Sequence, residues 1–121
     1  MKFLISLACL ICYSCCIADE EFAFKYKSTP AQYGIYGGEL GEIAKPTSKD
    51  AKVSFFVTGP AAREMFNAMP PDMDVPCSAD KDFRYRARDN HKLVCTKDKD
   101  GYACHFGFDL KSGKSIGGST C

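Results

Sequence analysis

Three arginines on one short segment are the residues whose type and spacing point most directly to a contact surface. Arg84, Arg86 and Arg88 alternate with two aromatic residues and an alanine. Alternate side chains of a β-strand share a face and stand about 6.6 Å apart, so the arginines form a row. Guanidinium groups bind carboxylates and phosphates through paired hydrogen bonds, and Lys92 on the next predicted strand would extend the row. The pattern predicts a surface that contacts an anion or a partner protein; the alternative is a solvated sheet face balanced by nearby acids.

The cysteines predict a covalent framework. The chain has eight, of which four lie within the first 16 residues. The other four are Cys77, Cys95, Cys104 and Cys121. An even number in an exported domain indicates two disulfides, and four cysteines allow three pairings. The preferred pairing joins Cys77 to Cys95 and Cys104 to Cys121, because each bond would close a loop of about 18 residues and contribute about 3 kcal/mol.

The other chemistry that these residue types could support is less well specified. His91 and His105 lie near cysteines, but the chain has no pair of cysteines two to four residues apart after residue 18, as structural zinc sites usually do. We therefore expect no metal site, no catalytic residue and no cofactor. Carboxylates are frequent, yet no two are singled out as the acid and base of a hydrolase. Enzymatic activity is uncertain, and its absence is the better expectation.

The N-terminus predicts export. Lys2 precedes an almost wholly apolar run from Phe3 to Ile17, and Cys16-Ile17-Ala18 has the small residues of a cleavage site. The run is shorter than the roughly 20 residues that span a bilayer as a helix. An uncleaved anchor and lipidation at one of the early cysteines are the alternatives. We expect residues 1–18 to be a cleaved signal peptide and residues 19–121 to be secreted or periplasmic.

The charge balance restricts the partners. The chain carries 16 Lys and Arg against 15 Asp and Glu, and removing Lys2 with the signal would bring the formal charge to zero. No global field would then draw the protein to nucleic acid or to a membrane surface. No second apolar run follows the predicted signal, so we expect no stable membrane insertion after cleavage. The expected partner is another protein, contacted through the arginine row or the charged hairpin tip Lys97–Gly101, with an anionic polymer as the alternative.

Hydrophobic periodicity predicts the elements that position the arginines and cysteines. Apolar residues recur at helical spacing after Pro60, which suits the first position of a helix. The segment 28–50 is rich in glycine and is expected to be loop-rich, either a long loop or a short irregular hairpin followed by a solvated connection. Asp100-Gly101 is a strong turn signal within the charged segment Lys97–Gly101. The predicted helix is Ala61–Met69, and the predicted strands are Phe22–Lys27, Val53–Thr58, Phe83–Arg88, His91–Thr96 and Tyr102–Leu110.

These elements predict an α+β fold. The expected structure is a small single domain with one helix packed on a mainly antiparallel sheet of about four to five strands, closed by two disulfides. Fold class does not specify function. The function we expect is that of an exported, disulfide-stabilised binding protein, such as an inhibitor or interaction module for an envelope or secreted protein. The alternatives are a small hydrolase acting on an envelope or extracellular polymer, and a structural surface component that associates through the edge of Phe83–Arg88.

Overall fold

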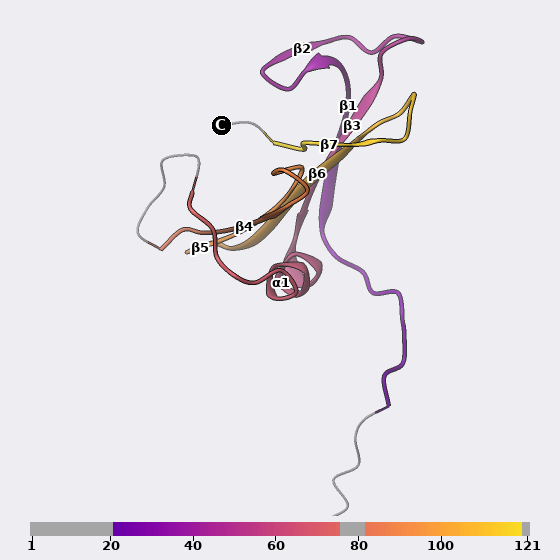
Figure 1. Ribbon diagram of the computed structural model, residues 1–121. Helices are drawn as coiled ribbons and strands as arrows, with labels where there is room; N and C mark the ends of the chain where they lie inside the picture. Colours follow the sequence, from indigo (N-terminus) through magenta and orange to yellow (C-terminus); the bar gives the residue numbers. More distant parts are fainter. Residues whose placement is uncertain (1–20, 76–81, 120–121) are drawn as a thin grey trace, which may run out of the picture.

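A computed structural model describes residues 21–75 and 82–119, which form one small α+β domain. One helix, α1 (Gly59–Asn67), packs on an antiparallel sheet in the strand order β2-β1-β3-β6-β5-β4, with β7 beside β6 (Figure 1). The fold class, the helix and the antiparallel sheet are confirmed, although the described chain has more strands than the four to five expected. The strands are β1 (Ala31–Glu39), β2 (Glu42–Ala44), β3 (Lys52–Thr58), β4 (Arg84–Arg88), β5 (Leu93–Asp98), β6 (Gly101–Asp109) and β7 (Ser115–Ile116).

The segment expected to be loop is the main source of the additional strands. Residues 28–50 contain β1 and β2, which form a hairpin closed by Glu39 opposite Glu42. Gly38 has a φ of 70°, which glycine adopts without strain at this bend. The hairpin alternative is confirmed, but a long strand β1 within the sheet was not expected. Glycines hid the alternation of Tyr33 and Ile35 with smaller residues, and this alternation pairs in register with β3.

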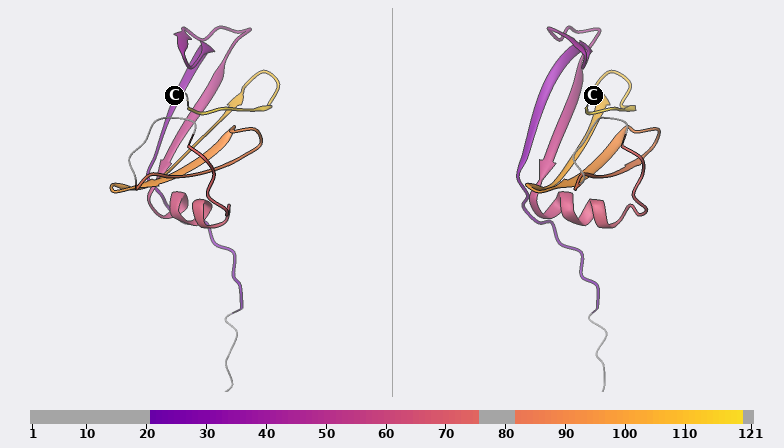
Figure 2. Two further views of the ribbon diagram at one scale, coloured as in Figure 1. Left: turned by 60° about the vertical axis from the view of Figure 1, so that its left-hand side comes forward. Right: turned by 90° about the vertical axis from the view of Figure 1, so that its left-hand side faces the viewer.

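The expected strand Phe22–Lys27 is not part of the sheet. This segment is extended and exposed, and in Figure 2 it leaves the domain beyond α1 in both views. It continues the line of β1 past the end of β3, where the described part of its own chain offers no neighbouring strand. The alternation of aromatic and other residues is real, but a strand also needs a partner, so the prediction was wrong within the monomer. We call Phe22–Lys27 the N-terminal arm.

The first turn of α1 and the side of the helix that faces the sheet agree with the sequence prediction. Gly59, with a φ of 68°, turns the chain out of β3, and Pro60 occupies the first turn, where its missing N–H costs no hydrogen bond. The apolar stripe faces the sheet: Ala62, Phe66 and Met69 are buried in one cluster with two cysteines from the strands below.

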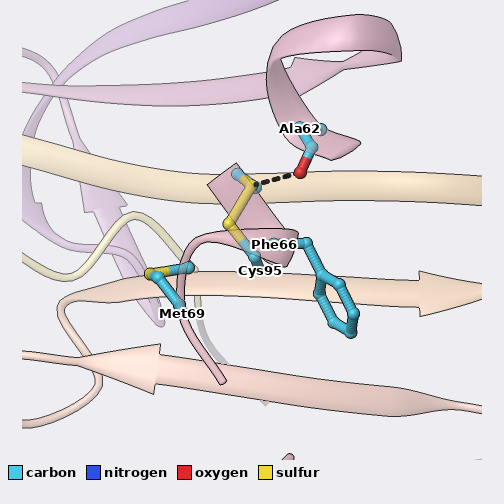
Figure 3. Packing of buried hydrophobic residues seen from close by; sticks show 5 residues of the cluster. Ala62, Phe66, Met69 and Cys95 are labelled. Atoms are coloured by element: carbon cyan, nitrogen blue, oxygen red, sulfur yellow. Dashed lines mark hydrogen bonds between the residues drawn. A yellow bond between two sulfur atoms is a disulfide. The ribbon is translucent and has the colours of Figure 1, made fainter. Parts of the chain in front are cut away.

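The two cysteines of this cluster form a disulfide with each other. Cys95 on β5 lies directly opposite Cys104 on β6, with 4.1 Å between their Cα atoms. Figure 3 shows the bond beneath α1, with Met69 and Phe66 on either side. The Sγ atom of Cys104 lies 3.6 Å from the carbonyl oxygen of Ala62, a close contact rather than a hydrogen bond, because an oxidised sulfur carries no proton.

This bond overturns both parts of the preferred pairing, Cys77 to Cys95 and Cys104 to Cys121. The preference rested on loop length, whereas register decides which side chains meet. Asp98 and Gly101 close the β5–β6 turn, and counting back three residues on each strand brings Cys95 opposite Cys104. Cys77 and Cys121 lie outside the described residues, as do residues 1–18, so the second bond and the signal peptide stay predictions.

The other strands match the sequence closely. Val53–Thr58, Phe83–Arg88 and Tyr102–Leu110 correspond to β3, β4 and β6 within one or two residues. Met73 makes a bridge to Tyr85, so β4 is the last strand of the sheet but its outer side is partly covered. Within the described ranges, no helix is long and apolar enough to cross a membrane.

We predict that Cys95→Ala with Cys104→Ala lowers the free energy of unfolding by about 2.5 kcal/mol, the value expected for a loop of this length, plus a cavity cost beneath α1. Denaturant unfolding of the double variant against the wild type measures the difference. Equal stability would show that the bond does not support the core.

We also predict the pattern of cross-linked peptides. Cys95 and Cys104 pair with each other. Once the predicted signal peptide is removed with its four cysteines, the intramolecular partner left for Cys77 is Cys121. Proteolysis without reduction, followed by mass spectrometry, should recover a Cys95–Cys104 cross-link and a separate Cys77–Cys121 cross-link. Recovery of Cys77 joined to Cys95 would contradict the register of β5 and β6.

Candidate functional site

The arginine row lies on the helix side of the sheet. Arg86 is opposite Cys95 in the ladder between β4 and β5, so its side chain and those of Arg84 and Arg88 share the face on which α1 packs. Lys92 precedes β5 and is one residue out of phase with Leu93, which lies opposite Arg88. The structure therefore brings the three arginines together and leaves Lys92 off their face.

The arginines are engaged within the chain. Asp72 accepts hydrogen bonds at one carboxylate from Arg84 Nε at 2.7 Å and from Arg86 Nε at 2.8 Å. Arg86 also donates to the carbonyl of Phe66 at 2.7 Å, and Arg88 donates to the carbonyl of Pro70 at 2.7 Å. The Phe66 carbonyl lies in the last turn of α1 and also accepts the N–H of Met69 at 3.2 Å, so Arg86 adds a second hydrogen bond to it. We call this set the arginine clamp, because it ties β4 to the segment that follows α1.

Aromatic packing strengthens the clamp. The guanidinium carbon of Arg86 lies 4.1 Å from the centre of the Phe66 ring, and that of Arg84 lies 5.2 Å from it. A cation over an aromatic face is attracted by the ring quadrupole. Sequence reasoning missed Asp72, the residue that joins two of the arginines, because it lies in a polar loop without periodicity. A binding role for the arginine row stays a prediction, and an outside anion would compete with Asp72 for it.

The carboxylate of Asp72 is strongly held in its charged form. Its hydrogen bonds with Arg84 and then Arg86 lower the pKa of Asp72 from 3.8 to about 2, and the same contact raises the pKa of Arg84. A carboxyl group whose pKa is lowered by folding stabilises the fold above its ordinary pKa and loses that contribution as the pH falls.

The other described carboxylates with shifted pKa values also hold the chain together. Asp50 binds the backbone N–H of Gly38 at 2.8 Å and Lys52 Nζ at 2.6 Å, and the bond to Lys52 is the larger cause of the lowered pKa of Asp50. The pKa of Asp109 is lowered by backbone N–H groups of Lys111 and then Ser112. A general acid in a hydrolase needs a raised pKa, and none of the shifted Asp and Glu side chains in residues 21–75 and 82–119 has one.

The two histidines lie in different parts of the sheet and contact different residues. The Tyr85 hydroxyl and His91 Nδ1 are 2.8 Å apart at the β4–β5 turn. His105 is half-buried with its ring centre 4.8 Å from that of Phe56, and burial lowers the pKa of His105. No group of three or more His, Cys, Asp and Glu side chains gathers anywhere in the described ranges.

A surface that sequence reasoning missed lies on β1, β3 and β6 beyond the end of α1. Tyr33, Phe55 and Phe106 are opposite one another across the three strands, and Ile35 and Phe108 flank Val53 in the next row. These rows are in phase with Cys104, so they lie on the helix side of the sheet. We call the five residues around Val53 the apolar patch: Tyr33, Ile35, Phe55, Phe106 and Phe108.

The apolar patch is exposed although its residues would suit a core. Tyr33 is 72% exposed, Ile35 46% and Phe108 39%. The Phe55 and Phe106 rings stack with their centres 5.4 Å apart. The strict alternation of Phe106 and Phe108 with smaller residues was visible in the sequence, but alternation alone cannot distinguish a covered row from an open one.

We predict that Asp72→Asn lowers the stability of the protein at pH 7. The variant should then lose less stability than the wild type as the pH falls from about 4 to about 2, because it has no carboxylate to protonate at this position. The matched control is Asp74→Asn, which alters an exposed carboxylate on the same segment. Thermal unfolding of both variants across this pH range measures the effect. Equal pH dependence in Asp72→Asn and wild type would contradict the clamp.

Comparisons of the chain with protein-family models, curated proteins and solved structures found no match.

Proposed function

We propose that this protein is an exported, non-enzymatic binding module that engages another protein through the apolar patch. The observation that carries the proposal is the exposure of Tyr33, Ile35 and Phe108 in adjacent rows of one sheet face. Contiguous exposed apolar patches are uncommon on monomeric proteins and mark contact sites for other molecules. Aromatic side chains supply much of the binding energy in such sites.

The electrostatics favour this surface over the arginine row. Arg84 and Arg86 already share the carboxylate of Asp72, and an incoming acidic group would have to displace it. The apolar patch requires no such exchange, because burying it removes only apolar surface from water. The near-zero net charge fits a partner recognised by shape and apolar contact rather than by long-range attraction.

The hydrolase alternative receives less support. Retaining and inverting glycosidases both use a carboxyl group with a raised pKa to protonate the leaving group. Among the described residues, the carboxylates with shifted pKa values have lowered ones, and their side chains are engaged in turns or ion pairs. No specific observation on the described residues favours a catalytic reading over a binding one.

We predict that Phe108→Asp weakens partner capture from the secreted or envelope fraction at least tenfold while leaving the fold intact. The loss of an aromatic contact and the burial of a charge each cost more than about 1.4 kcal/mol, which is a factor of ten in affinity. Bait carrying the wild-type sequence, Phe108→Asp or the control Lys111→Asp is compared by quantitative mass spectrometry. The control reverses a charge at the turn that follows β6.

A partner captured equally by wild type and Phe108→Asp would overturn the assignment to this patch. A partner captured by wild type and the control but lost from Phe108→Asp would support it. Circular dichroism and a melting curve for each bait establish that loss of capture is not loss of folding.

A further inference from the structure

We propose that two copies of this protein associate by exchanging their N-terminal arms, each arm adding a strand to the open edge of β1 in the other copy. This interaction goes beyond the proposed function and uses the sheet face opposite the apolar patch. Lys27 of the arm pairs with Glu64 of α1 at 2.7 Å, but both side chains are exposed, and such surface pairs contribute little. The proposal rests on three observations: the aromatic side chains of the arm are exposed in its own domain, the edge of β1 lacks a neighbour beside residues 31–36, and a groove lies at that edge.

The arm carries aromatic residues that its own domain leaves in water. Phe22 is 89% exposed, Phe24 69% and Tyr26 94%. Phe24 and Tyr26 contact each other edge to face, with ring centres 5.0 Å apart. The arm is nevertheless extended, and its aromatic residues alternate with Ala23 and Lys25 as in a strand with one apolar face.

The arm cannot fold back on its own sheet without breaking its attachment. Thr29 Oγ1 donates to the carbonyl of Thr58 at 2.7 Å and accepts the N–H of Ala61 at 3.2 Å. The carbonyl of Pro30 accepts the N–H of Thr58 at 3.1 Å. These bonds direct the chain straight into β1 and project the arm past the end of the sheet, as Figure 2 shows. The arm is therefore presented to another molecule.

The receiving edge is the side of β1 that faces away from β3. The Pro30 carbonyl points to β3, and the backbone groups of successive residues in a strand point to alternate sides. The even-numbered residues in this part of β1 therefore direct their N–H and C=O groups to β3. Ala31, Tyr33 and Ile35 direct theirs away from it. Within the described residues, 31–36 pair with β3 alone. Free backbone groups on an exposed edge are a template for an added strand.

A groove of about 350 Å³ lies at this edge, and Gly34 is one of the residues that line it. A Cβ atom built on Gly34 would meet nothing within 4 Å, so the space above this residue is open. The rest of the lining is largely apolar. It includes Tyr36, Leu40, Ile43 and Phe56, and Tyr33 and Ile35 of the apolar patch border the groove along the edge of β1.

Strand parity determines which face the arm's aromatic residues would cover. If the arm continues β1 as a regular strand, its odd-numbered residues turn their backbone groups toward the same open edge as Tyr33. Two such strands related by a two-fold axis then pair odd with odd and even with even. Among the registers that this parity allows, the one centred on Thr29 puts Phe24 over Gly34 of the other copy. An aromatic ring opposite an edge glycine covers the exposed backbone there. The aromatic face of the arm thus meets the groove.

The reciprocal exchange buries enough area for a stable dimer. Each aromatic side chain buries about 150–250 Å², so the three aromatic residues on each of the two arms bury about 1,000 Å² before the receiving grooves are counted. Specific interfaces bury about 1,200–2,000 Å² in total over both partners. A two-fold exchange also closes on itself, which ends assembly at two copies.

Sedimentation velocity of the purified full chain from about 1 to about 200 µM tests the proposal, because this range spans the affinities of weak to moderate dimers. We expect the wild type to double in mass with concentration. Phe24→Ser, at an exposed position of the monomer, and Gly34→Phe, which fills the groove, should each raise the dissociation constant at least tenfold. The control Lys25→Gln alters the opposite face of the arm and should stay within about twofold of the wild type.

A wild type that stays monomeric throughout this range would overturn the proposal, as would dimers that persist unchanged in both Phe24→Ser and Gly34→Phe. If Gly34→Phe does not fold, Phe24→Ser decides alone. Phe108→Asp should dimerise like the wild type, because it alters the other sheet face. Its loss of partner capture and the arm variants' loss of dimerisation are therefore independent results.

Discussion

The packing of α1 on the Cys95–Cys104 disulfide is the interaction on which the rest of the structure depends. A helix of nine residues is too short to be stable in water on its own. It persists here because Ala62, Phe66 and Met69 bury against a covalently closed pair of strands. The arginine clamp then fastens β4 to the end of the same helix, so the disulfide, the helix and the edge strand form one unit.

This arrangement concentrates the core at one end of the sheet. Strands β1, β3 and β6 extend away from α1, which crosses one end of the sheet (Figure 1), and their apolar rows continue onto a surface that the described chain leaves exposed. The opposite face of β1 carries a groove rather than a second layer. A chain that places aromatic residues on three such surfaces, including the arm, has more apolar area than its own core uses. The proposals assign that surplus to partners and to a second copy.

Local patterns in the sequence predicted most of the regular structure. Pro60 and the stripe from Ala62 to Met69 specified the helix, and Asp100-Gly101 specified the central hairpin. What local patterns could not supply was the pairing between distant segments. The alternation of the arm suits a sheet strand although the arm has no partner in its own sheet, and glycines weaken the alternation of β1. Loop length favours other partners for Cys95 and Cys104, whereas strand register pairs them with each other.

The candidate site was harder to predict, for the same physical reason. The arginine row was identified correctly as a row, but whether it faces solvent depends on Asp72, which approaches from a loop without periodicity. The apolar patch was invisible as a surface because Phe106 and Phe108 have the same sequence signature whether or not a helix covers them. The exposure of these side chains depends on which part of the sheet α1 covers, and only the assembled fold determines that.

The central claim is that the domain is complete without the arm, which is held for a second copy. Amide hydrogen exchange of peptides covering residues 21–27 and 31–36, measured by mass spectrometry on dilute and concentrated protein, tests it most directly. The account predicts that the arm exchanges at the rate of an unfolded chain when dilute and that both segments slow together as concentration rises. An arm that is equally protected at every dilution would mean that it packs on its own domain, and the account would be wrong.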